Sequence, residues 1–311
     1  MIIVTGGAGF IGSNLVRELN RRGRTDILVV DNLTRGAKFK NLADLTIQDY
    51  LDKREFRARL DAGTLDLRPE AVLHQGACSD TMCDDGRYMV DNNFGDSRAL
   101  LHWCLNRRIP FVYASSAATY GGSRAFAIDP ANERPLNVYG YSKLLFDQHV
   151  RSILPEAASP VVGLRYFNVY GPREQHKGRM MSVLHQLLRQ LKDTGACRLF
   201  QGADGYGDGE QVRDFVFVGD IVDLNLFFAD RGGRGIHNAG TGQARSFNAI
   251  AQTLIRLLGR GRIEYIPFPE ELRGKYQSYT QADLGSLREA GYDRPFTPLE
   301  DGIARTLAEL E

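Results

Sequence analysis

Residues 1–12 read MIIVTGGAGFIG, an apolar strand that runs directly into a turn with three glycines. Gly6, Gly9 and Gly12 recur at every third position, and the apolar residues after them follow helical spacing. Glycines placed in this way permit a tight turn and a close approach of the backbone to a pyrophosphate, while the helix N-terminus offers N–H donors and a positive dipole end. The segment therefore predicts the start of a Rossmann fold that holds a nicotinamide dinucleotide.

An acidic residue, Asp31, ends the second predicted strand, DILVVD, 19 residues after Gly12. A carboxylate there can accept hydrogen bonds from the adenosine ribose hydroxyls, and it would repel the 2′-phosphate of NADP. Arg35, Lys38 and Lys53 follow it and could neutralise such a phosphate. The residues alone therefore leave the choice between NAD and NADP open.

Further apolar runs alternate with helix-like stretches, among them AVLHQGA, FVYASSA and VVGLRYFNVYG. Fully apolar strands separated by helices predict an α/β fold with a doubly wound parallel sheet covered on both faces. The pattern changes near Gly171, where a basic loop and an amphipathic stretch from Met181 to Leu191 begin a second lobe. We predict a Rossmann domain of residues 1–168 and about 212–243, in which FVFVGD and GIHNAG return to the sheet. A smaller discontinuous α/β substrate-binding lobe is predicted for about 169–211 and 244–311.

The composition is that of an ordinary globular protein, with 43% hydrophobic residues, 25% charged residues and a net charge of +1. This charge balance gives no reason to expect a nucleic-acid or membrane partner. No window approaches the roughly 18 apolar residues of a spanning helix, and the opening strand lacks signal-peptide features, so we expect a cytoplasmic protein. The four cysteines lack a framework spacing and are expected to be packing residues. His74, Cys78 and Cys83 lack a fourth ligand at finger-like spacing, so we predict no metal site.

The segment LNVYGYSKLLFD carries the candidate reaction centre, because it places Tyr139 and Lys143 four residues apart on one face of a predicted helix. A tyrosine with a pKa of about 10 needs nearby positive charge to act as a base, and Lys143 and an oxidised nicotinamide would both supply it. Ser115 and Ser116 end the strand FVYASS, and ligands of open α/β sheets bind at the carboxyl ends of strands. One of these serines, which we take as Ser116, would orient the substrate hydroxyl.

TGGAGFIG, SSAATYG, the Tyr139 and Lys143 pair, RYFNVYGPRE and RDFVFVGD occur in this order, and the whole chain resembles the extended short-chain dehydrogenase/reductases that act on nucleotide sugars. DNLTRGAKFKNL, PLNVYGYSK and KYQSYTQADL resemble in particular the heptose 6-epimerases of that family. The resemblance implies epimerisation at C6 of an ADP-linked heptose, from ADP-D-glycero- to ADP-L-glycero-D-manno-heptose, for lipopolysaccharide core precursor synthesis. Transient oxidation to a 6-keto sugar and re-reduction with bound NADP are implied, in a homo-oligomer expected to be a pentamer.

The family's site residues fall on named positions of this chain. The resemblance implies that NADP contacts Gly6, Gly9, Phe10, Ile11, Gly12, Asp31, Asn32, Lys38, Lys53, Gln75, Gly76, Ala77, Cys78, Ser79, Asn92, Lys143, Val169 and Lys177. It places substrate contacts at Asn168, Arg179, His185, Phe200, Gln201, Gly202, Ala203, Arg213 and Tyr276. Arg213 suits a diphosphate because a guanidinium binds phosphate bidentately. Arg179 stands where the family has a small serine, and the loop 202–211 is longer than usual.

The resemblance also implies a second catalytic base, Lys177. A 6-keto sugar that is reduced from either face must exchange protons on two sides, and Tyr139 can serve only one of them. On the residues alone, Lys177 is one charge in a solvated basic loop with Arg173 and His176.

Three other functions are compatible with a dinucleotide-binding start of the chain. A UDP-sugar 4-epimerase would share the fold, the nicotinamide and the serine, tyrosine and lysine. A 4,6-dehydratase would need an extra acid and base where Ala117 and Ala118 stand, which disfavours it. A non-catalytic dinucleotide sensor is the third possibility, and the aligned Tyr139 and Lys143 speak against it.

Overall fold

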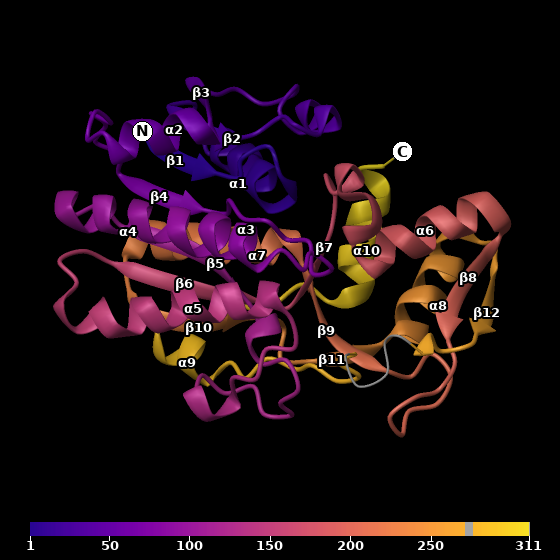
Figure 1. Cartoon of the computed structure of the whole chain (residues 1–311). Helices are drawn as coiled ribbons and strands as arrows, with labels where there is room; N and C mark the ends of the chain where they lie inside the picture. Colours follow the sequence, from indigo (N-terminus) through magenta and orange to yellow (C-terminus); the bar gives the residue numbers. More distant parts are fainter. Residues whose placement is uncertain (271–275, 311) are drawn as a thin grey trace.

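The structure is a computed structural model that describes residues 1–270 and 276–310, and it shows a large lobe and a smaller one side by side (Figure 1). The large lobe is built on a seven-stranded parallel sheet in the order β10-β6-β5-β4-β1-β2-β3. The order reverses between β1 and β4, which makes a switch point at the carboxyl ends of these strands. The predicted α/β fold is confirmed. The strands are β1 (Ile2–Thr5), β2 (Ile27–Asp31), β3 (Asp49–Asp52), β4 (Ala71–His74), β5 (Phe111–Ser116), β6 (Val161–Tyr166) and β10 (Arg234–Ala239).

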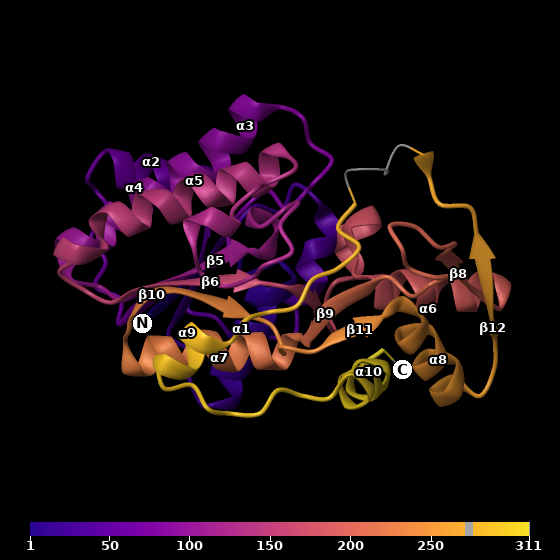
Figure 2. The same ribbon diagram turned by 90° about the horizontal axis from the view of Figure 1, so that it is seen from below.

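Helices cover both faces of this sheet, as its side view shows (Figure 2). Alternate residues of each strand point to opposite faces, so Ile3 and Val4 of β1 enter different hydrophobic cores. One face packs against α1 (Phe10–Arg21) and α7 (Val218–Arg231). The other packs against α2 (Lys53–Asp61), α4 (Asp96–Arg107) and α5 (Val138–Ile153), with α3 (Gly86–Val90) joined to α4 through one π-helical turn, Asp91–Gly95.

The smaller lobe holds two small sheets and the helices packed on them. β7 (Asn168–Tyr170), β9 (Val212–Phe217) and β11 (Ala244–Ser246) form one sheet, and β8 (Ala196–Phe200) pairs in parallel with β12 (Arg262–Ile266). The helices are α6 (Val183–Thr194), α8 (Phe247–Leu258) and α10 (Leu299–Ala308). Phe10 of α1 belongs to the core of this lobe, so the N-terminal turn touches both lobes.

The chain does not return to the large sheet at FVFVGD, and that prediction is wrong. Residues 212–217 form β9, which pairs with β7 because the chain has already left the large sheet after Tyr166. GIHNAG does return, as β10 beside β6. Near the C-terminus, α9 (Gly285–Glu289) lies against β10, with Leu287 in the core of the large lobe. None of the helices within residues 1–270 and 276–310 is both long and apolar enough to cross a membrane.

Candidate active site

The glycine turn between β1 and α1 leaves no room for side chains. A Cβ on Gly12 would lie 2.1 Å from the Gly6 carbonyl oxygen, and one on Gly6 would lie 2.8 Å from the Gln75 carbonyl carbon. Gly6 also has a φ of +66°. The first intrahelical bond of α1 runs from Ser13 N to Gly9 O at 3.0 Å, and within the described chain no side chain caps the helix. The N–H groups of Phe10, Ile11 and Gly12 precede that bond, have no intrahelical acceptor and can bind an anion such as a pyrophosphate.

At the end of β2, the Asp31 carboxylate is buried and already occupied. It accepts hydrogen bonds from Ala8 N at 2.8 Å and Asn32 N at 2.6 Å, and it forms an ion pair with Lys38. Lys53, which follows the neighbouring strand β3, donates to the Asn92 side chain. Lys38 thus offsets the negative charge where the adenosine ribose would lie.

The catalytic helix candidate, α5, begins one residue before Tyr139. Asn137 caps it, because its side-chain oxygen accepts from Gly140 N at 2.8 Å. Lys143 is buried one turn further on and donates to the Ala114 carbonyl oxygen at 2.9 Å. Burial lowers the pKa of Lys143 to about 8. Burial raises the pKa of Tyr139, and the interaction with the Ser116 side chain acts in the opposite direction.

The two adjacent serines at the end of β5 have different surroundings. Ser115 is buried and donates to the Asp147 carboxylate at 2.8 Å. Ser116 points to the other side of the pleated strand, accepts from Ala118 N at 3.1 Å and lies within hydrogen-bond reach of Tyr139. The side chain next to the tyrosine is therefore that of Ser116.

Lys177 lies on a loop that is docked onto the glycine turn. Its Nζ is 5.1 Å from the centre of the Phe10 ring and 3.7 Å from a Glu174 carboxylate oxygen. The loop is held by Asn14, which donates to Pro172 O at 3.1 Å, and by Asn41, which donates to Arg173 O at 3.0 Å. These contacts place the lysine beside the start of α1, whereas Tyr139 reaches the same edge of the sheet from α5.

The segment after β4 meets the turn with its backbone. The Gln75 side chain is turned inward, where it accepts from Tyr166 OH at 2.9 Å and donates to Asn225 at 2.9 Å. The backbone N–H and carbonyl of Cys78 are bound by Asn93 at 2.8 and 3.0 Å. Residues 75–78 therefore offer a rigid backbone surface next to Gly6.

A buried cation lies in the smaller lobe. The Arg213 guanidinium is 4.7 Å from the Tyr276 ring centre and 5.8 Å from that of Phe247. Burial lowers its pKa, and among the described residues the groups that act on it electrostatically are the phenols of Tyr276 and Tyr206. Phe200 lies edge-on to Tyr276 with 6.5 Å between ring centres. A buried positive charge between aromatic rings is suited to the diphosphate and base of a nucleotide.

Other predicted substrate residues lie at varied depths. His185 is buried on α6, 2.7 Å from Gly171 O and 3.4 Å from the Glu174 carboxylate, so it supports the loop that carries Lys177. Arg179 is largely exposed and pairs with Asp80 at 2.9 Å. Asn168 is exposed at the start of β7, and Val169 is partly buried between the two lobes.

In the long loop, Gln201 N donates to Ile266 O at 2.8 Å and Gly202 N to the Asp208 side chain at 2.8 Å. Ala203 O accepts from Tyr206 N at 3.0 Å. The loop thus folds back on itself.

Two supporting residues were missed by the sequence reasoning. Asn41 donates to Ala8 O at 3.1 Å as well as to Arg173 O, and so joins the turn to the Lys177 loop. Asp147 lies one turn after Lys143 on the buried face of α5. An acid among the buried apolar positions of a helix was the available signal for Asp147; nothing in the sequence marks Asn41.

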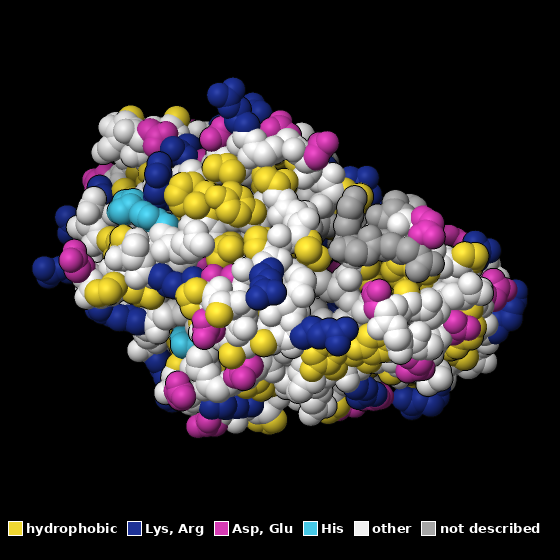
Figure 3. Space-filling view, turned by 60° about the horizontal axis from the view of Figure 1, so that its bottom comes forward, with side chains coloured by type: hydrophobic (Ala, Val, Ile, Leu, Met, Phe, Trp, Pro, Cys, Tyr) yellow, Lys and Arg dark blue, Asp and Glu magenta, His cyan; other side chains and the backbone are white. Residues whose placement is uncertain are grey.

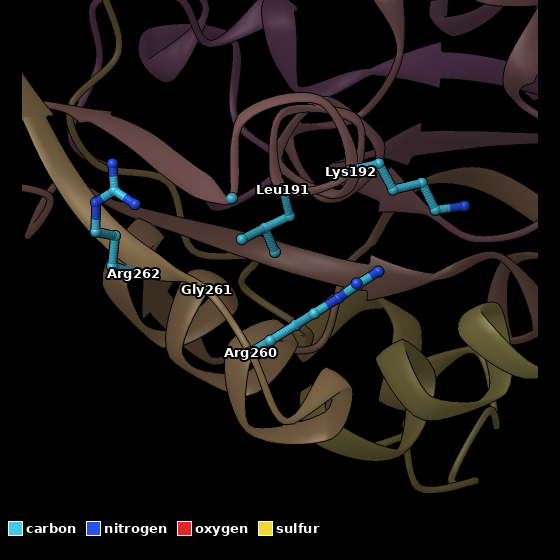
Figure 4. Close-up of a pocket in the computed structure, with 6 residues that line it drawn as sticks. Leu191, Lys192, Arg260, Gly261 and Arg262 are labelled. Atoms are coloured by element: carbon cyan, nitrogen blue, oxygen red, sulfur yellow. The ribbon is translucent and has the colours of Figure 1, made fainter.

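A separate hollow lies between the ends of α6 and α8 (Figure 4). It is lined by Leu191, Lys192, Gly195, Arg260, Gly261 and Arg262. Lys192 lies in the last turn of α6, and Arg260 and Arg262 follow the end of α8. Positive charge at these ends complements the helix dipoles. It shares no residue with the site described above.

Comparisons with known proteins find similarity over nearly the whole chain. Residues 2–240 match the model of the NAD dependent epimerase/dehydratase family. A protein of Alkalilimnicola ehrlichii named ADP-L-glycero-D-manno-heptose-6-epimerase is 63% identical over 309 residues, which cover 99% of this chain and 96% of that protein.

Two solved structures have the same fold. The Helicobacter pylori ADP-L-glycero-D-manno-heptose-6-epimerase superposes with a TM-score of 0.87 at 32% identity, covering 99% of this chain and 95% of the other. The Thermus thermophilus UDP-glucose 4-epimerase, solved in complex with NAD, superposes with a TM-score of 0.79 at 27% identity, with 99% and 97% covered.

Proposed function

Since the chain belongs to the NAD dependent epimerase/dehydratase family, we propose that it inverts C6 of an ADP-linked heptose, interconverting ADP-D-glycero- and ADP-L-glycero-D-manno-heptose. The observation that carries this proposal is the near full-length similarity to the Alkalilimnicola ehrlichii protein of that name. The predicted family resemblance is confirmed. The reaction would serve lipopolysaccharide core precursor synthesis in the cytoplasm.

We propose NADP as the bound cofactor, held by the glycine turn, Asp31, Lys38, Lys53 and the backbone after β4. The free N–H groups of α1 suit its pyrophosphate, and Lys38 offsets Asp31 where a 2′-phosphate would lie. When bound, NADP would supply the reversible hydride chemistry that takes C6 through a transient 6-keto sugar without an outside oxidant.

Tyr139 would exchange the proton of the C6 hydroxyl on one side. Ser116 interacts with its phenol and would orient the sugar oxygen. The Lys143 ammonium, one turn further along α5, would favour the deprotonated phenol. The buried face of α5 excludes water from this lysine.

Lys177 would exchange the proton on the other side. It stands on a different element from Tyr139 and is held against Phe10 by the docked loop. Two bases on separate elements suit a substrate that must present either face of C6 to the hydride. Arg213, stacked on Tyr276, would bind the diphosphate of ADP.

The test incubates the purified protein with ADP-D-glycero-D-manno-heptose and, separately, with UDP-glucose, and resolves the products by NMR. We expect a mixture of the C6 epimers from the first and no change in the second. Tyr139→Phe and Lys177→Met should each abolish epimerisation while the bound cofactor is retained. Conversion of UDP-glucose would instead support the 4-epimerase, and a protein inert toward both sugars whose cofactor stays unreduced would support the sensor.

We further propose that the chain assembles into a homo-oligomer, expected to be a pentamer from the family resemblance. Hydrophobic side chains gather on the surface of the large lobe (Figure 3), and Tyr88 on α3 and Tyr141 on α5 are each nearly half exposed. Such exposed aromatic side chains are frequent in protein contacts. Light scattering should give about five times the 34.7 kDa mass of one chain. A monomeric mass would contradict this proposal.

A further inference from the structure

The buried Asp147 carboxylate attaches α5, the candidate catalytic helix, to the large sheet. Asp147 lies on α5 and is fully buried. It accepts hydrogen bonds from Tyr113 OH at 2.9 Å, from Ser115 Oγ at 2.8 Å and from Arg165 Nε at 2.9 Å. The donors belong to β5 and β6, so this one side chain fastens α5 to two adjacent strands of the sheet.

The carboxylate is also the end of a chain of alternating charges. Arg165, itself fully buried, bonds to Asp147 and to Glu133, and its guanidinium lies 4.8 Å from the Tyr120 ring centre. Glu133, on the loop before α5, forms a second ion pair with Arg151 near the end of α5. These ion pairs thus connect α5 to β6, β6 to the loop before α5, and that loop back to the end of α5.

Asp147, Arg165 and Glu133 are buried, while Arg151 is partly exposed. Burying three charges is costly unless each is paired, and a buried ion pair adds little stability over a pair of apolar residues. Because these ion pairs add little stability, a role in positioning α5 explains them better. Asp147 lies one turn after Lys143 and two turns after Tyr139, which is about 12 Å along the helix axis. Its hydrogen bonds to β5 fix the rotation and height of α5 on the strand that ends at Ser116.

We propose that Asp147 is a positioning residue for the epimerisation, since it sets Tyr139 against Ser116 and supplies the negative charge that supports the Lys143 ammonium. This inference rests on the proposed function, because it concerns how the residues of that site are held. No contact of Asp147 with substrate or cofactor is required.

Within residues 1–270 and 276–310, Tyr139 and Asp147 each lie one turn from Lys143 on its own helix. His74 on β4 and Cys78 in the segment after β4 also interact electrostatically with Lys143. Burial lowers the pKa of Lys143 to about 8, and Asp147 opposes that shift. The charge of Asp147 is itself balanced by Arg165, which also pairs with Glu133.

The test is Asp147→Asn in the full-length protein with its cofactor bound. The amide keeps the shape of the side chain but removes the charge, so Lys143 should lose its proton at lower pH. We expect kcat to fall about tenfold or more, KM for the ADP-heptose to stay within about twofold, and the alkaline limb of kcat to move down by about one pH unit. Wild-type kcat together with a wild-type alkaline limb would overturn the inference.

Tyr113→Phe is the matched control, because it removes one hydrogen bond to the same carboxylate and no charge. Its alkaline limb should not move. If Asp147→Asn does not fold, Asp147→Glu carries the test: it keeps the charge but displaces the anchor, so the alkaline limb should stay and kcat should fall. An Asp147→Glu protein with unchanged kcat would overturn the positioning role.

The proposed function can fail separately, as a wild-type protein that does not act on ADP-heptose. The inference is then tested without turnover, by NMR titration of the 15N-labelled Lys143 side chain in the wild type and in Asp147→Asn. A lower pKa in the variant supports the inference. Equal pKa values overturn it.

Discussion

At the level of single residues, Asp31 shows how the charge of a buried acid at the end of β2 is offset within the protein. Its carboxylate is fixed by two backbone N–H groups and by Lys38. A ligand bound there would meet the neutral pair of Asp31 and Lys38. Selectivity between NAD and NADP would therefore depend on Lys38 as much as on Asp31. Removing Lys38 would leave the Asp31 carboxylate with its two backbone donors but without a cationic partner.

Lys38→Ala should therefore weaken NADP binding far more than NAD binding. Loss of a charge-assisted contact and exposure of the Asp31 charge predict a roughly tenfold to hundredfold higher Kd for NADP and little change for NAD. Fluorescence titration of the cofactor-free protein with each dinucleotide measures both. Lys40→Ala, an exposed lysine two residues on, is the control and should behave as wild type. Equal losses for the two cofactors would argue against a phosphate contact by Lys38.

The two serines of β5 should also separate by mutation. Ser116→Ala should lower kcat about a hundredfold, because it removes the hydroxyl next to the Tyr139 phenol. Ser115→Ala removes one of three donors to Asp147 and should stay within about tenfold of wild type. Steady-state assays of both variants with the ADP-heptose decide the matter. The opposite ranking would assign the catalytic role to Ser115.

At the level of elements, the turn into α1 depends on the absence of a side chain at Gly12. Gly12→Ala would place a Cβ 2.1 Å from Gly6 O, and the backbone must shift to relieve that contact. We expect a loss of bound cofactor and about 1–3 kcal/mol of stability. Cofactor content after purification and a thermal melt measure these effects. Gly36→Ala, where nothing lies within 4 Å, should change neither. A Gly12→Ala protein that retains its cofactor would show that the turn tolerates the shift.

The elements differ in how far sequence reasoning could reach them. α1 and α5 follow from apolar spacing and from the residues before them, because both signals are local. The sheet to which β9 belongs cannot be predicted in this way, because an apolar run does not show which strand it pairs with. Pairing with β7 decided that, and β7 itself depends on a change of direction at Phe167.

Some residues of the candidate site could be predicted from the sequence, and others depend on how the elements pack. Tyr139 and Lys143 are four residues apart on one helix, so spacing alone brings them together. The choice between Ser115 and Ser116 depends on which side of β5 faces α5, and Asp147 acquires its partners only when β6 is in place. His185 was predicted by resemblance as a substrate contact, and the structure places its ring against Gly171 O and Glu174. Its contact with substrate stays a prediction.

At the level of the whole molecule, acid should destabilise the fold through a buried histidine. His74 is held between the Thr5 and Ser97 hydroxyls at 2.7 and 2.8 Å, and burial lowers its pKa from 6.5 to about 3. The folded protein keeps this ring neutral, while the unfolded chain takes up a proton below pH 6.5. Its contribution to stability is therefore complete above pH 6.5 and is lost as the pH falls toward 3.

Thermal melts between pH 7 and pH 4 test this, with His74→Gln as the variant and His102→Gln, at an exposed position, as the control. The Tm of wild type and of the control should fall steeply on acidification. His74→Gln should begin from a lower Tm and fall less. An equal fall of Tm with pH in all three proteins would show that His74 does not cause the acid destabilisation.

The route of the chain between the lobes also bears on how the protein is made. Residues 168–217 of the smaller lobe are synthesised before α7 and β10, although α7 covers one face of the large sheet. A nascent chain that has reached residue 217 therefore leaves Val4, Leu73 and Val112 partly uncovered, and a ribosome adds only about 5–20 residues per second. Chaperone binding to the emerging chain should be strongest in this interval, and it should end once residues 218–239 have left the exit tunnel and closed the sheet.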